Sequence, residues 1–209
     1  MLFKKNILSN NTLFAIWKIE ESVDELSKQL NKEFLLDSRY KSLKNETRKQ
    51  EYLCTRLLIK NLLGEEKTII YNEAGKPSLA DNSYQLSISH TSAYVAVILH
   101  PTQAVGIDIE KRSERVLKLK EKFMSPTELE AIDKKQETLH TLLHWSAKET
   151  LFKILPETEI DFIEHLHIHP FIPNTEGSFI AHETRTNEQE KFEINYQVFE
   201  DFILTCSTK

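Results

Sequence analysis

Only four glycines occur among the 209 residues of this chain. A phosphate-cradling P-loop and a dinucleotide-binding fingerprint each need several glycines close together, and no stretch of the sequence supplies them. Both kinds of nucleotide-binding loop are therefore excluded. With six prolines and so few glycines, the sequence also contains no flexible linker, low-complexity tract or obvious short repeat.

Cysteines and long apolar runs are also scarce. The two cysteines, Cys54 and Cys206, lie far apart among apolar neighbours, which argues against a disulfide framework and favours a reducing compartment. No stretch approaches the roughly 20 apolar residues that span a bilayer, and no apolar run near the first residue is long enough for a signal peptide. We therefore expect a soluble cytoplasmic protein that does not bind membranes. The net charge of -5 argues against a general nucleic-acid binder.

The remaining composition, 40% hydrophobic and 28% charged, is that of an ordinary globular protein with room for one large or two small domains. Strand and helix patterns occur in a similar order on each side of Pro101. We predict an α+β fold of two similar halves, residues 1–102 and 103–209, each with an antiparallel sheet and packed helices.

Capping, periodicity and turn signals predict the main elements. Ser22 and Glu25 form a capping-box pattern, and so do Ser125 and Glu128. The expected elements are a strand over 12–19, a helix from Ser22 through Leu30, a helix over 42–63 stopped by Gly64, a strand over 68–71, a hairpin over 84–99, a helix opening at Ser125, a helix over 137–155, and strands over 163–169, 178–183, 192–199 and 202–206.

One strand carries two acidic side chains on a single face. In Val105-Gly106-Ile107-Asp108-Ile109-Glu110 the apolar and acidic residues alternate with period two. Asp108 and Glu110 would lie roughly 6–7 Å apart on the face opposite the core. A hard cation such as Mg²⁺ suits two carboxylates at that separation. The alternative is a solvated strand at the rim of a sheet.

The predicted helix over 137–155 presents a second polar face. Glu149 points away from the apolar stripe and stacks with Trp145 and Lys153 at four-residue spacing. The alternative for Glu149 and Lys153 is a surface ion pair worth about 0.3–0.5 kcal/mol. Other candidate motifs fail, because Thr141 replaces the glutamate that a zinc helix at His140 and His144 needs.

Histidine and serine patterns elsewhere give weaker signals. His165, His167 and His169 share one strand face, but no cysteine or carboxylate is clearly placed to complete a metal site, so a solvated face is the simpler interpretation. Ser89 and His90 are adjacent without a nucleophile elbow, so a serine-hydrolase triad lacks support.

Taken in order, the motifs resemble the 4′-phosphopantetheinyl transferases of the larger, Sfp type. The signatures of that family are G-[IV]-D-[IV]-E and, some forty residues later, W-[ST]-x-K-E-[AST]-x-x-K. Both are present here, at 106–110 and 145–153. The upstream Gly75-Lys76-Pro77 and Ser89-His90 match as well, and the resemblance covers about residues 45–155. The first forty residues and the last third of the chain match nothing specific.

This resemblance implies a transfer of the phosphopantetheine arm from coenzyme A to a serine of an apo acyl or peptidyl carrier protein, with Mg²⁺ as cofactor. The two halves would form a pseudo-dimer with coenzyme A bound between them, in a protein that we expect to be a monomer. Asp108, Glu110 and Glu149 would hold the Mg²⁺. Glu149 would act as base, and Lys153 and Asp108 would complete the catalytic set. The coenzyme A contacts implied are Arg48, Arg56, Lys76, Pro77, Ser89, His90 and Lys148, the last of these with a surface position as its alternative.

Two other functions fit the same motifs. A Mg²⁺-dependent hydrolase of coenzyme A or a related pyrophosphate would use water in place of serine, and a coenzyme A-binding module would carry out no reaction. The segment Lys111–Lys122 has six basic residues against two acidic ones. It could attract an acidic carrier protein, or it could be a solvated loop.

Overall fold

The computed structural model describes residues 1–8, 10–156 and 159–209. The chain separates into two units, Met1–Thr102 and Gln103–Lys209. Each unit contains an antiparallel sheet with helices packed on it, so the predicted α+β class is confirmed. The pseudo-dimeric arrangement of the halves stays a prediction. In the part of the chain described, no helix combines the length and the apolar character needed to cross a membrane.

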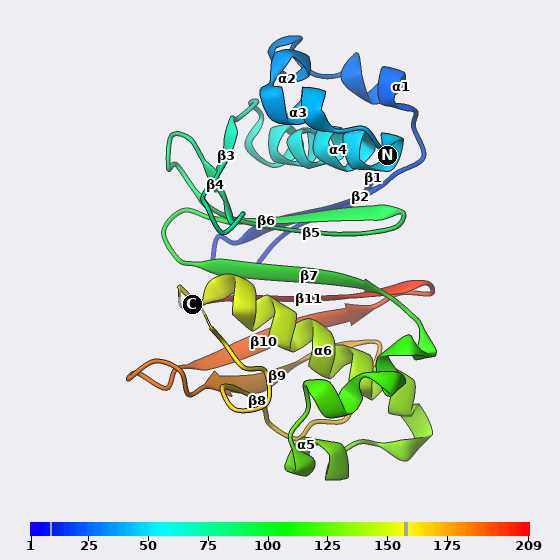
Figure 1. Cartoon of the computed structure of the whole chain (residues 1–209), viewed down its shortest axis with the longest axis vertical. Helices are drawn as coiled ribbons and strands as arrows, with labels where there is room; N and C mark the ends of the chain where they lie inside the picture. Colours follow the sequence, from blue (N-terminus) through cyan, green and yellow to red (C-terminus); the bar gives the residue numbers. More distant parts are fainter. Residues whose placement is uncertain (9, 157–158) are drawn as a thin grey trace. The chain divides into compact units, whose positions relative to one another are not determined.

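The first unit is built on a four-stranded antiparallel sheet in the order β1-β2-β6-β5. Its core forms where the long helix α4 covers β2 and β6 (Figure 1). A short antiparallel ribbon, β3-β4, lies beside it. The elements are β1 (Leu2–Ile7), β2 (Leu13–Lys18), α1 (Val23–Ser27), α2 (Glu33–Leu36), α3 (Ser38–Ser42), α4 (Glu46–Leu63), β3 (Ile69–Tyr71), β4 (Pro77–Leu79), β5 (Gln85–Thr91) and β6 (Tyr94–His100).

Helix α4 is the helix expected over 42–63, but it begins four residues later. Asn45 caps it, because the Asn45 side chain accepts a hydrogen bond of 2.8 Å from the Thr47 N–H. Gly64 ends it at φ 77°, a left-handed conformation that glycine adopts without a steric penalty. The expected capping box of α1 is present, although that helix ends at Ser27. Strand β1 and helix α3 were not expected from the sequence.

The second unit is built on a five-stranded antiparallel sheet in the order β7-β11-β10-β9-β8. Helix α6 crosses this sheet and packs on β7 and β11 (Figure 1). Its elements are β7 (Val105–Lys111), the 3₁₀ turns η1 (Glu114–Lys118), η2 (Lys120–Lys122) and η3 (Lys134–Gln136), α5 (Pro126–Glu130), α6 (Glu137–Ile154), β8 (Leu166–Ile168), β9 (Glu176–Glu183), β10 (Lys191–Val198) and β11 (Phe202–Thr208).

The two units repeat one topology. In the first, β2 leads through helix α4 to the hairpin β5-β6, and β6 returns to pair with β2. In the second, β7 leads through helix α6 to the hairpin β10-β11, and β11 returns to pair with β7. This repeat agrees with the similar order of elements that the sequence predicts for the two halves.

Strand β7 approaches helix α6 so closely that only glycine fits at one position. A Cβ atom added to Gly106 would lie 2.2 Å from the Thr150 carbonyl oxygen and 2.8 Å from Cγ1 of Ile154. Both distances are below any ordinary contact, so a side chain would push the helix away from the strand. The glycine of the G-I-D-I-E motif therefore sets the distance between the strand that carries Asp108 and the helix that carries Glu149.

Candidate active site

Asp108 lies in β7 with its carboxylate buried under α6. The acidic face of the strand is therefore the face that the helix covers, and the expectation that this face lies opposite the core is wrong. Oδ1 accepts a hydrogen bond of 2.8 Å from Lys153 Nζ, and Oδ2 accepts one of 2.8 Å from Ser146 Oγ. On the neighbouring strand β11, Thr205 stands opposite Asp108, and its hydroxyl lies 2.8 Å from Ser146 Oγ and 2.7 Å from Thr150 Oγ1. The carboxylate is thus fixed by helix α6 and supported from the adjacent strand.

Glu110, two residues along the same strand face, is held by a tryptophan. Trp145 Nε1 donates a hydrogen bond of 2.7 Å to Glu110 Oε1. The indole packs edge-on against Phe123, at 5.1 Å between ring centroids, and beside Phe162 at 5.7 Å. Burial, followed by the negative charge of Asp108, raises the pKa of Glu110. Trp145 therefore orients a carboxylate as well as packing the helix.

Glu149 completes an acidic cluster with Asp108 and Glu110. It lies on α6 between Trp145 and Lys153, one helical turn from each. Burial raises its pKa to about 7, with the charges of Asp108 and Glu110 adding to the effect and that of Lys153 opposing it. A carboxylate whose pKa lies near neutrality is suited to accept and release a proton at physiological pH.

The acidic cluster offers the kind of donor atom that a divalent cation prefers. Three carboxylates stand against one ammonium, and carboxylate oxygens are the protein ligands that Mg²⁺ prefers. Burial is the main cause of the raised pKa values of Glu110 and Glu149, and the negative charge of Asp108 adds to it. Within residues 1–8, 10–156 and 159–209, however, no three acidic, histidine or cysteine side chains form a group close enough to hold one ion.

Lys148 does not have the role expected for it. Its side chain is 0% exposed, and its ammonium donates to the carbonyls of Phe123 and Phe162, at 2.7 and 2.8 Å, and to Glu128 Oε2 at 2.8 Å. All three donors are used inside the fold, so both the phosphate contact and the surface position are wrong. The helical register turns this residue inward. Glu128 also accepts from the Ile168 N–H at 2.8 Å, which ties α5 to α6 and β8.

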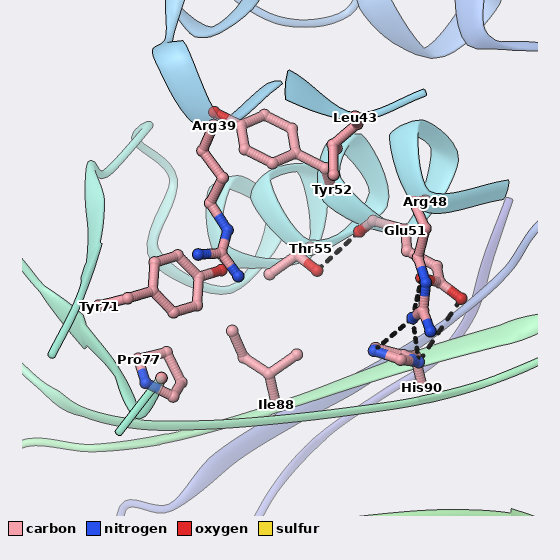
Figure 2. Close-up of a pocket in the computed structure, with 11 residues that line it drawn as sticks. Arg39, Leu43, Arg48, Glu51, Tyr52, Thr55, Tyr71, Pro77, Ile88 and His90 are labelled. Atoms are coloured by element: carbon pink, nitrogen blue, oxygen red, sulfur yellow. Dashed lines mark hydrogen bonds and ion pairs between the residues drawn. The ribbon is translucent and has the colours of Figure 1, made fainter. Parts of the chain in front are cut away.

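The first unit contains a pocket of about 440 Å³ beside α4 (Figure 2). Three of the residues that the resemblance implies for coenzyme A, Arg48, Pro77 and His90, line it. Lys76 is exposed between two lining residues, and Ser89 is buried in β5 next to His90. The lining residues are Arg39, Leu43, Arg48, Glu51, Tyr52, Thr55, Tyr71, Gly75, Pro77, Ile88 and His90.

Two charged lining residues, Arg39 and Glu51, were not expected from the sequence. The guanidinium of Arg39 stacks over the ring of Tyr71, 3.7 Å from its centroid, and points into the pocket (Figure 2). Glu51 lies on α4 in contact with Arg48 and His90. Arg39 comes from α3, a helix that the pattern did not predict, and Glu51 follows Arg48 by three residues, a spacing that places both on one helix face.

Arg56 lies beneath the pocket wall rather than on it. Its side chain is 2% exposed, and its guanidinium stacks 3.2 Å from the ring centroid of Tyr52, itself a lining residue. It donates to the Tyr52 carbonyl at 3.1 Å and lies 4.0 Å from the Asp37 carboxylate. A phosphate contact by Arg56 would require the guanidinium to leave this stacked position, so we assign it a supporting role under Tyr52.

The histidines that the sequence singled out lie outside both sites. His140 and His144 are buried beside Phe171. His167 lies on β8 and His169 directly follows that strand, both next to His182 of β9, with 2.9 Å between His169 Nε2 and His182 Nδ1.

Comparison with known proteins identifies the second unit. A family model described as "4'-phosphopantetheinyl transferase superfamily" matches residues 104–207, which is nearly all of that unit. The second unit belongs to the 4′-phosphopantetheinyl transferase superfamily. The resemblance inferred from the motifs is thereby confirmed at the level of the superfamily. Residues 104–207, which the family model matches, include the acidic cluster and Lys153.

A curated relative gives the same family. The chain is 36% identical over 85 residues to the "4'-phosphopantetheinyl transferase Sfp" of Bacillus subtilis (strain 168). The match covers 39% of this chain and 38% of that protein, so it spans well under half of the relative's length.

Proposed function

We propose that this protein transfers the 4′-phosphopantetheine arm of coenzyme A to a serine hydroxyl of an apo acyl or peptidyl carrier protein, with Mg²⁺ as cofactor and adenosine 3′,5′-bisphosphate as the second product. The observation that carries the proposal is the cluster of Asp108, Glu110, Glu149 and Lys153. These four side chains come from the two motifs of the phosphopantetheinyl transferase superfamily.

The reaction forms a bond from the serine oxygen to the phosphorus that bears the pantetheine arm, and the bond from that phosphorus to the bridging oxygen breaks. Glu149 takes the serine proton, directly or through a water molecule, since its pKa of about 7 lets it act as a base near neutral pH. Lys153 offsets charge that develops on the pyrophosphate. A Mg²⁺ ion held by Asp108, Glu110 and Glu149 would neutralise charge on the same group.

The first unit is proposed to bind the nucleotide part of coenzyme A. Arg48 and His90 line the pocket with cationic or hydrogen-bonding groups, and the Gly75-Lys76-Pro77 turn adds the ammonium of Lys76. Ser89 would donate a hydrogen bond. Coenzyme A brings a pyrophosphate and a 3′-phosphate to a protein whose net charge is already -5, so local cations must supply the affinity.

The carrier protein is proposed to dock on the basic segment Lys111–Lys122, which forms the end of β7 and the turns η1 and η2. One of its lysines, Lys120, is paired with Glu137 at 2.8 Å, and the others leave the segment strongly basic. Complementary charge between this segment and an acidic carrier would speed their encounter.

The test is intact-mass analysis of an apo carrier protein incubated with the enzyme, coenzyme A and Mg²⁺. A gain of one phosphopantetheine arm is expected. Asp108→Ala should reduce transfer by about two orders of magnitude or more, because the residue that anchors Lys153 and the proposed cation is lost. Glu176→Ala, which removes an exposed carboxylate at the start of β9, is the matched control and should transfer normally.

Three outcomes would reject this assignment. Normal turnover by Asp108→Ala at saturating Mg²⁺ would show that the acidic cluster is not the active site. Release of adenosine 3′,5′-bisphosphate at the full rate without any carrier would identify a hydrolase instead. Binding of coenzyme A with neither reaction would identify a binding module.

A further inference from the structure

We propose that Glu51 is a positioning residue for nucleotide binding. Its carboxylate holds the Arg48 guanidinium and the His90 imidazole in the arrangement that receives a phosphate group of the nucleotide. The inference rests on the proposed function, because it takes the pocket of the first unit to be the site of the coenzyme A nucleotide. It goes beyond that function by giving a role to a negative charge in a pocket for an anion.

The contacts of Glu51 form a closed triangle (Figure 2). Arg48 Nη1 lies 2.8 Å from Glu51 Oε2, and His90 Nδ1 lies 3.5 Å from Glu51 Oε1. Arg48 Nη1 also lies 3.2 Å and 3.4 Å from the two ring nitrogens of His90. Each of the three side chains therefore contacts the other two, and all three line the pocket.

The three side chains of the triangle differ in how much of each is exposed to solvent, and only that of Glu51 is held by packing. The Glu51 side chain is 11% exposed, whereas those of Arg48 and His90 are 56% and 42% exposed. A long, solvated arginine samples many rotamers, and ordering it on ligand binding costs entropy. The spacing of three residues, just under one turn of α4, places Glu51 beside Arg48 on one helix face. Glu51 therefore gives the arginine a rigid anchor before the ligand arrives.

Removing the negative charge of Glu51 distinguishes two explanations of its role in the pocket. If Glu51 only adds negative charge to the pocket, removing that charge will tighten binding of a phosphate-bearing ligand. If Glu51 positions Arg48 and His90, removing the charge will release both side chains and weaken binding. The two explanations predict changes of opposite sign for one substitution, Glu51→Gln, which keeps the size of the side chain.

The experiment measures binding of coenzyme A and of adenosine 3′,5′-bisphosphate by calorimetry, with no carrier present. Glu51→Gln should weaken both ligands about tenfold or more, since a charge-assisted contact is lost. Glu51→Asp should retain part of the affinity. Glu46→Gln, at an exposed position in the first turn of the same helix, changes the net charge equally and should leave binding within about twofold of wild type.

Two further readouts separate positioning from folding. In the transfer reaction, Glu51→Gln should raise KM for coenzyme A while kcat at saturating coenzyme A stays within about threefold, the pattern expected for lost ground-state binding. In an Arg48→Ala background, Glu51→Gln should have a much smaller effect, because the group that it positions is gone. Thermal melting of each variant measures any loss of fold directly.

Equal or tighter binding by folded Glu51→Gln would overturn the inference, and so would an undiminished effect in the Arg48→Ala background. Neither result would affect the proposed function, which requires only that the wild-type protein bind coenzyme A and transfer the arm. Failure of the wild-type protein to bind either ligand would reject the nucleotide assignment itself, and the inference about Glu51 with it.

Discussion

The raised pKa of the Glu149 carboxyl group predicts how the free energy of unfolding changes with pH. An unperturbed glutamate has a pKa of 4.5, and burial beside Asp108 raises that of Glu149 to about 7. Between these two pH values the folded protein keeps a proton that the unfolded chain has released. The free energy of unfolding therefore falls as pH rises from 4.5 through 7, and the full penalty is present above pH 7.

The size of this penalty follows from the two pKa values. Each tenfold change in the proton-dissociation constant corresponds to about 1.4 kcal/mol, so a shift from 4.5 to about 7 sets an upper limit of roughly 3 kcal/mol. Glu149 is half-buried and some solvent screening remains, so we expect about 1–3 kcal/mol. Glu149→Gln removes the penalty. The variant should be more stable than wild type by this amount at pH 8 and nearly equal to it at pH 4.5.

Urea unfolding at both pH values, with a chelator present to exclude divalent cations, measures the difference. Transfer by Glu149→Gln should fall sharply at the same time, because the amide cannot accept the serine proton. Leu151→Ala is the matched control on the buried face of α6: it should lose about 2–5 kcal/mol and keep its activity per folded molecule. If Glu149→Gln is no more stable than wild type at pH 8, the electrostatic description of the cluster is wrong.

Three other changes test separate parts of the structure. Gly106→Ala should destabilise the protein by about 1–3 kcal/mol or more and reduce transfer, because the added methyl group forces β7 and α6 apart; an unchanged melting temperature would contradict this. Lys148→Met should cost about 3–5 kcal/mol by leaving Glu128 buried and unpaired, and adding Glu128→Gln should recover part of the loss in urea unfolding. Removing the side chain of His90 or Lys76 should weaken coenzyme A more than 3′-dephospho-coenzyme A in calorimetry, and equal losses would show that neither contacts the 3′-phosphate.

The parts of the candidate active site that the sequence predicts are those fixed by local periodicity. Period two places Asp108 and Glu110 on one face of β7, and four-residue spacing places Trp145, Glu149 and Lys153 on one face of α6. Because β7 carries one motif and α6, which covers β7, carries the other, the two acidic faces meet and form the cluster. The capping boxes and the 85–100 hairpin are likewise encoded by neighbouring residues, and the structure confirms them.

The parts that the sequence does not predict depend on contacts between distant segments. Lys148 is a charged residue next to Glu149 in the sequence, and only its distant acceptors at Phe123, Glu128 and Phe162 make full burial possible. Arg56 is buried because Tyr52 stacks over it. The strand β1 is an exposed edge strand whose lysines and asparagine weaken the strand pattern, so pairing with β2 decides its structure.

The hydrogen bond from Trp145 to Glu110 makes the acidic cluster visible to fluorescence. The chain has two tryptophans, and they fall one in each unit: Trp17 is buried in the first, and Trp145 contacts the cluster in the second. Replacing Trp17 by phenylalanine leaves a single tryptophan, whose indole N–H donates to one of the carboxylates proposed to hold Mg²⁺. A cation that drew Glu110 toward itself would change the partner of that N–H, and the emission spectrum would then report occupation of the cluster in real time, without label, carrier protein or turnover.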